Sequence, residues 1–187
     1  MSTITQATSL KDLNGTFNLD PSHSRVGFIA RHAMVAKVRG AFDEVTGTAT
    51  IDGANPAASS LEVNIVAASI DTRDANRDAH LRSADFFDAE TYPTLSFKAT
   101  GFTILDDQTV EVTGDLTIKD VTRPVTVPFE FGGAAVDPFG NERIGFEGSV
   151  VVNRKDWGLT WNAALEAGGV LVSDKVTLEL EVSAVRA

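Results

Sequence analysis

Three histidines are the side chains of this sequence best suited to metal binding or to general acid-base chemistry. The three histidines, His23, His32 and His80, form no His-x-x-x-His pair, the spacing that places two metal ligands on one helix face. We expect structural roles for them: His80 anchors a helix and His23 braces the turn at Asp20-Pro21. The chain has no cysteine, which excludes thiolate nucleophiles, disulfides and thiolate metal sites. No metal and no cofactor is therefore expected.

Hydrolase and nucleotide motifs are missing from the sequence. Neither Gly-x-Ser-x-Gly nor Gly-x-Gly-x-x-Gly occurs, and no spacing marks a nucleophile beside a base or a pair of catalytic carboxylates. An enzyme would need acidic residues that are distant in the sequence to come together at the open end of the folded domain. We expect a protein that is not an enzyme.

Arginines are concentrated in one short polar segment and could bind a phosphate, since the guanidinium group matches phosphate in a bidentate way. The head-group candidates are Arg73, Asn76, Arg77, His80 and Arg82, together with Arg31 and His32. The alternative is a solvated, ion-paired helix, because carboxylates and arginines also recur three and four residues apart. These pairs are Asp74 with Arg77 and Asp78 with Arg82.

The same segment has helix-forming composition, whereas the rest of the chain alternates with period two in Val, Ile, Thr and Phe. We expect one helical excursion around residues 72–90, ending before Tyr92-Pro93. The expected strands are Thr16–Leu19, Ser24–Lys37, Arg39–Ile51, Ser60–Ala68, Thr94–Leu105, Thr109–Lys119, Arg123–Gly132, Arg143–Asn153 and Lys175–Ala184. Pro124 and Pro128 mark an edge, a bulge or a bent corner, because proline cannot donate to a strand ladder.

About eight long antiparallel strands form either a closed barrel or a two-sheet sandwich, and the strand lengths favour the barrel. The fold class is thus all-β, an extended eight-stranded antiparallel barrel with a short helical segment. Its inward positions are apolar, and the aromatic residues are eleven Phe, two Trp and one Tyr. Such an interior is either a packed core or a dry ligand cavity, and the pattern leaves both open.

Length and charge limit the partners. The 187 residues make one domain, and a net charge of −10 repels nucleic acid and, as a mean field, anionic lipid surfaces. No eighteen apolar residues run together, so no integral membrane segment is expected. The first residues lack a basic region followed by an apolar one, and we expect a cytoplasmic protein.

Several blocks of sequence are distinctive when taken together. They are Asp20-Pro21-Ser22-His23-Ser24-Arg25-Val26-Gly27-Phe28, Val38-Arg39-Gly40-Ala41-Phe42, Ser69-Ile70-Asp71-Thr72, Arg77-Asp78-Ala79-His80-Leu81-Arg82-Ser83-Ala84-Asp85-Phe86-Phe87, Tyr92-Pro93-Thr94-Leu95-Ser96-Phe97, Thr113-Gly114-Asp115-Leu116-Thr117-Ile118 and Asn153-Arg154-Lys155-Asp156-Trp157-Gly158-Leu159. From Phe17 to Val182 the chain resembles the YceI-like family of lipocalin-like barrels. We assign residues 1–15 to an N-terminal extension and 16–187 to a single YceI-like domain.

The resemblance implies a long apolar tunnel that holds a polyisoprenoid, an isoprenoid quinone or a fatty amphiphile without catalysis. The expected function is binding, sequestration or transport; the alternative is a filled barrel that acts as a structural or protein-interaction module. Pairing into a homodimer is left open. The expected ligand contacts are Phe28, Ala30, His32, Val63, Ile65, Arg77, His80, Leu81, Phe86, Phe97, Leu116, Ile118, Phe129, Phe146 and Trp157.

Overall fold

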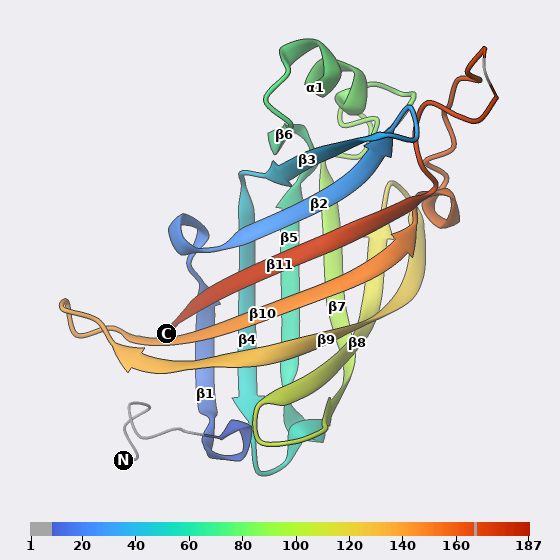
Figure 1. Cartoon of the computed structure of the whole chain (residues 1–187). Helices are drawn as coiled ribbons and strands as arrows, with labels where there is room; N and C mark the ends of the chain where they lie inside the picture. The colour runs from blue at the N-terminus through green and yellow to red at the C-terminus, as the bar shows by residue number, and fades with distance from the viewer. Residues whose placement is uncertain (1–8, 167) are drawn as a thin grey trace.

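Eight antiparallel strands close into a barrel in the computed structural model, which describes residues 9–166 and 168–187 (Figure 1). The order around the barrel is β1-β4-β5-β7-β8-β9-β10-β11, and β11 returns to β1 through Phe17–Leu19 opposite Ala184–Arg186. The strands of the ring are β1 Asn14–Leu19, β4 Val45–Asp52, β5 Ser60–Val66, β7 Thr94–Ile104, β8 Thr109–Ile118, β9 Val121–Val136, β10 Glu142–Asn153 and β11 Lys175–Arg186. The expected all-β barrel is confirmed.

Three further strands extend the sheet at one end of the barrel. They are β2 Arg25–His32, β3 Ala36–Phe42 and β6 Ile70–Asp71. A 3-10 helix at Pro21–His23 separates β1 from β2, so that β11 pairs with β1 along one part of its length and with β2 along another. Strands β2, β3 and β6 thus extend the sheet from one part of β11, while another part of β11 closes the ring with β1.

The strand boundaries expected at Ser24–Lys37 and Arg39–Ile51 are wrong. The chain turns at residues 33–35 between β2 and β3, and Asp43 and Glu44 separate β3 from β4. Ala33 and Met34 adopt positive φ angles of 50° and 67°, a region that costs energy for residues other than glycine. No Gly or Asn marks this turn, which explains why the alternation pattern ran through it.

Strand β9 contains both prolines and behaves as an edge where they lie. Pro124 and Pro128 pair with β8, whereas the pairing of β9 with β10 begins only at Phe129. Proline lacks a backbone N–H, but on the side of a strand that has no neighbour this removes no hydrogen bond between strands. Proline is therefore tolerated there. Of the edge, bulge or bent corner expected from the two prolines, the structure shows the edge.

Helix α1, Ala75–Arg82, is the one α-helix among the described residues, and it lies at the upper end of the barrel in Figure 1. Asp74 caps it by accepting hydrogen bonds from the backbone N–H groups of Asn76 and Arg77. No helix in the described part of the chain is long and apolar enough to cross a membrane. The helical excursion expected near residues 72–90 is confirmed, with regular helix only at 75–82.

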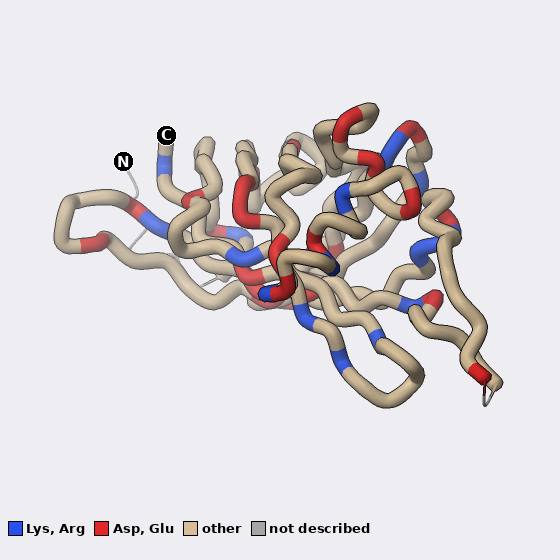
Figure 2. The backbone as a smooth tube through the Cα atoms, turned by 90° about the horizontal axis from the view of Figure 1, so that it is seen from above, with Lys and Arg blue, Asp and Glu red and all other residues tan. Residues whose placement is uncertain are grey.

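Buried side chains form two clusters, one toward each end of the barrel. The cluster toward the α1 end includes Phe86, Trp157 and Leu159; the cluster toward the other end includes Leu13 and Phe17. Two hairpins extend beyond the barrel body, β9–β10 and β2–β3 (Figure 2). Residues 1–8 of the expected N-terminal extension lie outside the described residues, while Leu10 and Leu13 are buried against the barrel.

Candidate functional site: an apolar cavity inside the barrel

A cavity of about 230 Å³ lies inside the barrel. Every strand of the ring contributes to its wall, and the wall along β8 runs from Val110 to Leu116, which is about 20 Å of strand. A water molecule needs only ~10–15 Å³ of such space, so the cavity is much larger than a packing defect. The interior is hollow over much of its length.

The α1 end of the barrel is filled, and this closes the cavity on that side. Trp157 is 2% exposed and packs with Phe86 and Leu159 in the core cluster. Its indole N–H donates to the backbone carbonyl of Leu116 over 2.9 Å, so the ring is buried with its polar atom satisfied. Trp157 is a plug at this end of the barrel.

Small residues leave the other part of the barrel open. Strand β4 contributes Gly47 and Ala49 to the wall, where neighbouring strands contribute Val, Leu and Phe. Phe97 lies flat along the wall rather than across the barrel, since a Cβ on Gly114 would stand 2.4 Å from its ring. The small residues Gly47 and Ala49 therefore leave a space inside the barrel that the larger side chains of the neighbouring strands do not fill.

Four residues with polar side chains border the cavity: Thr48 in the middle of β4, and Asp52, Ser59 and Ser60 at the β4–β5 connection opposite α1. The hydroxyl of the exposed Thr48 donates to Asn18 Oδ1. The N–H of Asp52 donates to Ser59 Oγ, and Asp52 Oδ1 accepts from the N–H of Asn55, both over 2.9 Å. Asp52 is the one ionisable side chain among the described residues that line the cavity. The wall is apolar along almost its whole length, which suits a long apolar molecule.

A second, smaller cavity adjoins the first where β1 gives way to β2. It measures about 190 Å³ and is lined by apolar residues together with the polar Ser24, Arg25 and Asp43. Leu19 and Val26 line both cavities and form the partition between them.

Six of the expected ligand contacts line the large cavity: Val63, Ile65, Phe97, Leu116, Phe129 and Phe146. The other nine lie outside its wall: Phe28, Ala30, His32, Arg77, His80, Leu81, Phe86, Ile118 and Trp157. Of these nine, Ile118, Phe86, Leu81 and Trp157 belong to or pack against the core cluster at the α1 end. Phe28 packs against Phe42 on the β2–β3 hairpin.

Two arginines of the helical segment, Arg77 and Arg82, bind groups of the chain just before the helix. Arg77 donates to the hydroxyl and the carbonyl oxygen of Thr72, each over 2.7 Å. Arg82 donates to the carbonyls of Ala68 and Ile70 over 2.8 and 3.3 Å. Among the described residues no ion pair joins Asp74 to Arg77 or Asp78 to Arg82, although the backbone N–H of Arg77 and its charge both lower the pKa of Asp74. The side chains of Arg77 and Arg82 fasten α1 to the strand end before it.

The carboxylates of that segment also have local partners. Asp78, which is buried, accepts from the N–H and the hydroxyl of Thr72 over 2.9 and 2.5 Å. His80 contacts Asp85 over 2.8 Å and stacks edge-on against Phe86 and Trp161. His80 thus anchors the helix, as its position in the sequence predicted.

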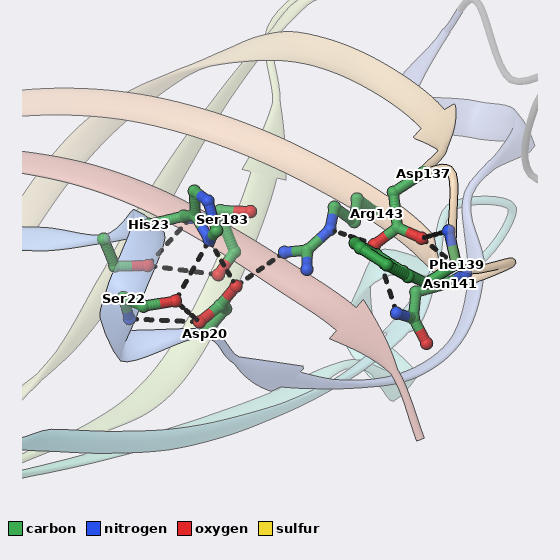
Figure 3. Close-up of polar contacts among 9 residues, drawn as sticks. Asp20, Ser22, His23, Asp137, Phe139, Asn141, Arg143 and Ser183 are labelled. Carbon is green, nitrogen blue, oxygen red and sulfur yellow. Dashed lines mark hydrogen bonds and ion pairs between the residues drawn. The ribbon is translucent and has the colours of Figure 1, made fainter.

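A polar network joins the β9–β10 hairpin to the turn after β1 (Figure 3). Arg143 donates to Asp20 over 2.6 Å and to Asp137 over 2.8 Å. Hydrogen bonds from Arg143, and then from Ser22 and His23, hold the pKa of Asp20 well below its usual range. The Arg143 guanidinium and the N–H of Asn141 lower the pKa of Asp137 in the same way.

The residues Asp20, Ser22 and His23 do not form a catalytic triad. Ser22 Oγ and Asp20 Oδ2 both contact His23 Nδ1, at 3.1 and 2.8 Å, and Ser22 also donates directly to Asp20. A triad requires the serine and the carboxylate on opposite ring nitrogens. The histidine braces the turn at Asp20, as expected.

Sequence alternation missed part of the cavity wall for two physical reasons. A β-bulge between Ala99 and Gly101 shifts the register of β7, so that the inward face changes from Phe97 to Phe102 and Ile104. Gly101 inside the strand is the signal that could have revealed the shift. Leu10 and Leu13 reach the cavity from a 3-10 helix and its cap, which have no period-two pattern.

Metal binding has no geometric support in residues 9–166 and 168–187, where no group of three or more His, Asp or Glu side chains is placed to hold an ion.

Arg154, which is buried, donates to the carbonyls of Ser173, Leu159 and Trp161. Burial lowers its pKa, against the opposing charge of Asp174. This arginine orders the connection between β10 and β11.

The chain belongs to the YceI-like family, whose model matches residues 17–184. It is 38% identical to a UPF0312 protein of Vibrio cholerae over 165 residues, which are 88% of this chain and 83% of that one. The crystal structure of BcnA from Burkholderia cenocepacia superposes with a TM-score of 0.77 at 25% identity, covering 88% of this chain and 98% of BcnA.

A third comparison shares the fold alone. A polyisoprenoid binding domain from Saccharophagus degradans superposes with a TM-score of 0.71 at 14% identity, covering 94% of this chain and 100% of that domain.

Proposed function

We propose that this protein binds a polyisoprenoid or a similar long-chain amphiphile inside the barrel and performs no chemistry on it. The observation that carries the proposal is the cavity of about 230 Å³ with an apolar wall. Apolar walls stay dry when empty and accept hydrocarbon, because water finds too few hydrogen-bond partners there. The polyisoprenoid binding domain of Saccharophagus degradans, which shares the fold, supports the choice of ligand class.

The energetics suit a chain-like ligand. Each buried CH₂ contributes ~0.8 kcal/mol, so a five-carbon isoprene unit offers roughly 3–4 kcal/mol before ordering costs. Three or four buried units allow tight binding without any charged contact. In this proposal the polar end of the ligand lies at the β4–β5 connection, where Asp52, Ser59 and Ser60 border the cavity.

The cavity favours a ligand-binding protein over a purely structural barrel and over an enzyme. A filled barrel serving only as a structural module would have no need of an open interior next to Gly47 and Ala49. An enzyme would need a converged acid and base, whereas Asp52 stands alone among the ionisable groups of the described wall. Transport, homodimer formation and a cytoplasmic location stay predictions from the sequence.

Filling the cavity tests the proposal. Ala49→Phe places a ring in the open space beside Phe17 and Leu61, its cross-strand partners. Geranylgeraniol is titrated into the wild type and the variant, and the complex is measured by native mass spectrometry. We expect the wild type to form a 1:1 complex and the variant to bind at least ten-fold more weakly with a melting temperature near that of the wild type.

Val151→Phe is the matched control, because Val151 is 58% exposed on β10 and does not line the cavity. Equal binding of geranylgeraniol by Ala49→Phe and the wild type would overturn the proposal. If Ala49→Phe fails to fold, Ala49→Leu adds a smaller side chain at the same point and serves the same comparison.

A further inference from the structure

The β2–β3 hairpin carries a charge opposite to that of the whole chain. The protein has 26 acidic and 16 basic residues, yet no carboxylate occurs between Asp20 and Asp43. The same stretch contains four cations, and they are Arg25, Arg31, Lys37 and Arg39. Figure 2 shows the hairpin projecting from the body with basic positions and no acidic ones.

Strand register places three of these cations together on one face. Arg31 lies directly opposite Lys37, and Arg39, two residues further along β3, points to the same side. All three side chains are exposed, and none takes part in the ion pairs among the described residues. Like charges directly opposite each other destabilise a hairpin, so the fold itself gains nothing from this arrangement.

The tip of the same hairpin is apolar and turned to solvent. Met34 is 59% exposed and Val35 is 80% exposed. A hydrogen bond of 2.7 Å from the N–H of Ala33 to the carbonyl of Leu171 brings a second loop against the tip, and its Val170 is 41% exposed. An apolar tip followed by a cluster of cations on one face is the amphipathic pattern of surfaces that lie in a bilayer interface.

We propose that the β2–β3 hairpin docks the protein onto anionic lipid bilayers, with Met34 and Val35 in the interface and the cations at the phosphates. At a rise of ~3.3 Å per residue, Arg31 and Lys37 stand about 7–10 Å behind the tip, which matches the depth of the interface. Nucleic acid would engage the cations but offers nothing to the apolar tip. The proposal does not depend on what the barrel holds.

The net charge of −10 is compatible with such docking. Salt screens exposed charges beyond about 8–10 Å at physiological ionic strength, so a bilayer senses mainly the charges nearest to it. The acidic remainder of the molecule then favours one orientation, with the hairpin toward the lipid. A protein docked in this way is positioned at a source of apolar ligands.

Vesicle co-flotation tests the proposal directly. The full chain is mixed with vesicles of phosphatidylcholine alone, or with 30% phosphatidylglycerol, at about 0.1 M salt, near the ionic strength at which the Debye length is about 10 Å. Each cation near an anionic surface changes the partition coefficient by about five-fold. We therefore expect binding to the anionic vesicles, and a loss of roughly 100-fold for the triple variant Arg31→Gln, Lys37→Gln, Arg39→Gln.

The control for charge is Lys11→Gln, Lys98→Gln, Lys119→Gln, which makes the same change in net charge away from the hairpin. The control for the tip compares Met34→Ser, Val35→Ser with Phe139→Ser, since Phe139 is 89% exposed on the other hairpin. We expect the tip variant to lose at least ten-fold in binding and both controls to match the wild type.

Three results would overturn docking on lipid. The first is equal binding of the wild type and the triple variant to anionic vesicles. The second is an unchanged affinity of the tip variant, which would leave only a site for polyanions. The third is binding of a DNA duplex as tight as that of the vesicles, with the same loss in the triple variant.

Discussion

Replacing Phe97 tests whether the ligand contacts the wall of the cavity or the filled end of the barrel. Phe97 lines the cavity and packs against both core clusters, so Phe97→Ala removes packing and also one face of the ligand site. Replacing a buried Phe by Ala lowers the free energy of unfolding by ~3–5 kcal/mol. Because the Phe97 ring already borders open space, we expect the lower value, about 3 kcal/mol. That corresponds to a fall of about 6–12 °C in Tm.

The effect of the same variant on ligand binding follows from the surface that the ring offers. About 50 Å² of ring facing the ligand, at ~25 cal/mol per Å², gives about 1.3 kcal/mol. Binding of geranylgeraniol, measured by native mass spectrometry, should therefore weaken by roughly ten-fold. The matched control is Phe86→Ala, since Phe86 is 6% exposed in the filled end and does not line the cavity.

Phe86→Ala should lose a similar amount of stability and bind geranylgeraniol as the wild type does. The reasoning is refuted if both variants lose stability while Phe97→Ala retains full affinity, because the cavity wall would then not be the ligand contact. It is equally refuted if Phe86→Ala weakens binding as much as Phe97→Ala.

Two further predictions concern the supports of the barrel. Trp157→Phe removes the N–H that bonds the carbonyl of Leu116 and should cost about 2–3 kcal/mol in thermal or urea unfolding; an unchanged midpoint would show that the buried bond does not stabilise the plug. Arg143→Gln should lower Tm at pH 7. Because Arg143 depresses the pKa of both Asp20 and Asp137 in the folded state, the difference from the wild type is fully present above pH ~4, the unfolded value, and shrinks at lower pH. A difference that stays constant from pH 7 to pH 2 would contradict this.

Much of the fold followed from the sequence because strands exposed on one face have a strong period of two. The alternation located every strand of the ring to within a few residues, except where β3 and β4 meet at Asp43 and Glu44. The turn at Ala33 and Met34 could not be foreseen, since its positive φ angles are adopted by residues that do not favour them. Tertiary pairing with the loop at Leu171 supports it.

The candidate site was harder to predict than the fold because its extent depends on packing between distant segments. Whether the α1 end is open or filled is decided by Trp157, which is far in sequence from the carbonyl of Leu116 that it binds. The arginines near α1 matched a phosphate site in type and number. The side chains of Arg77 and Arg82 donate instead to the carbonyls of Thr72, Ala68 and Ile70, which no spacing rule reports.

The central claim is that the barrel is a container for an apolar chain. The most direct measurement is native mass spectrometry of freshly purified wild type and Ala49→Phe, followed by solvent extraction and identification of the extracted lipid. The account predicts an added mass on the wild type that extracts as a polyprenyl or acyl compound and is absent from Ala49→Phe. A wild type that stays free of ligand both as purified and after incubation with polyprenyl and acyl lipids would contradict it.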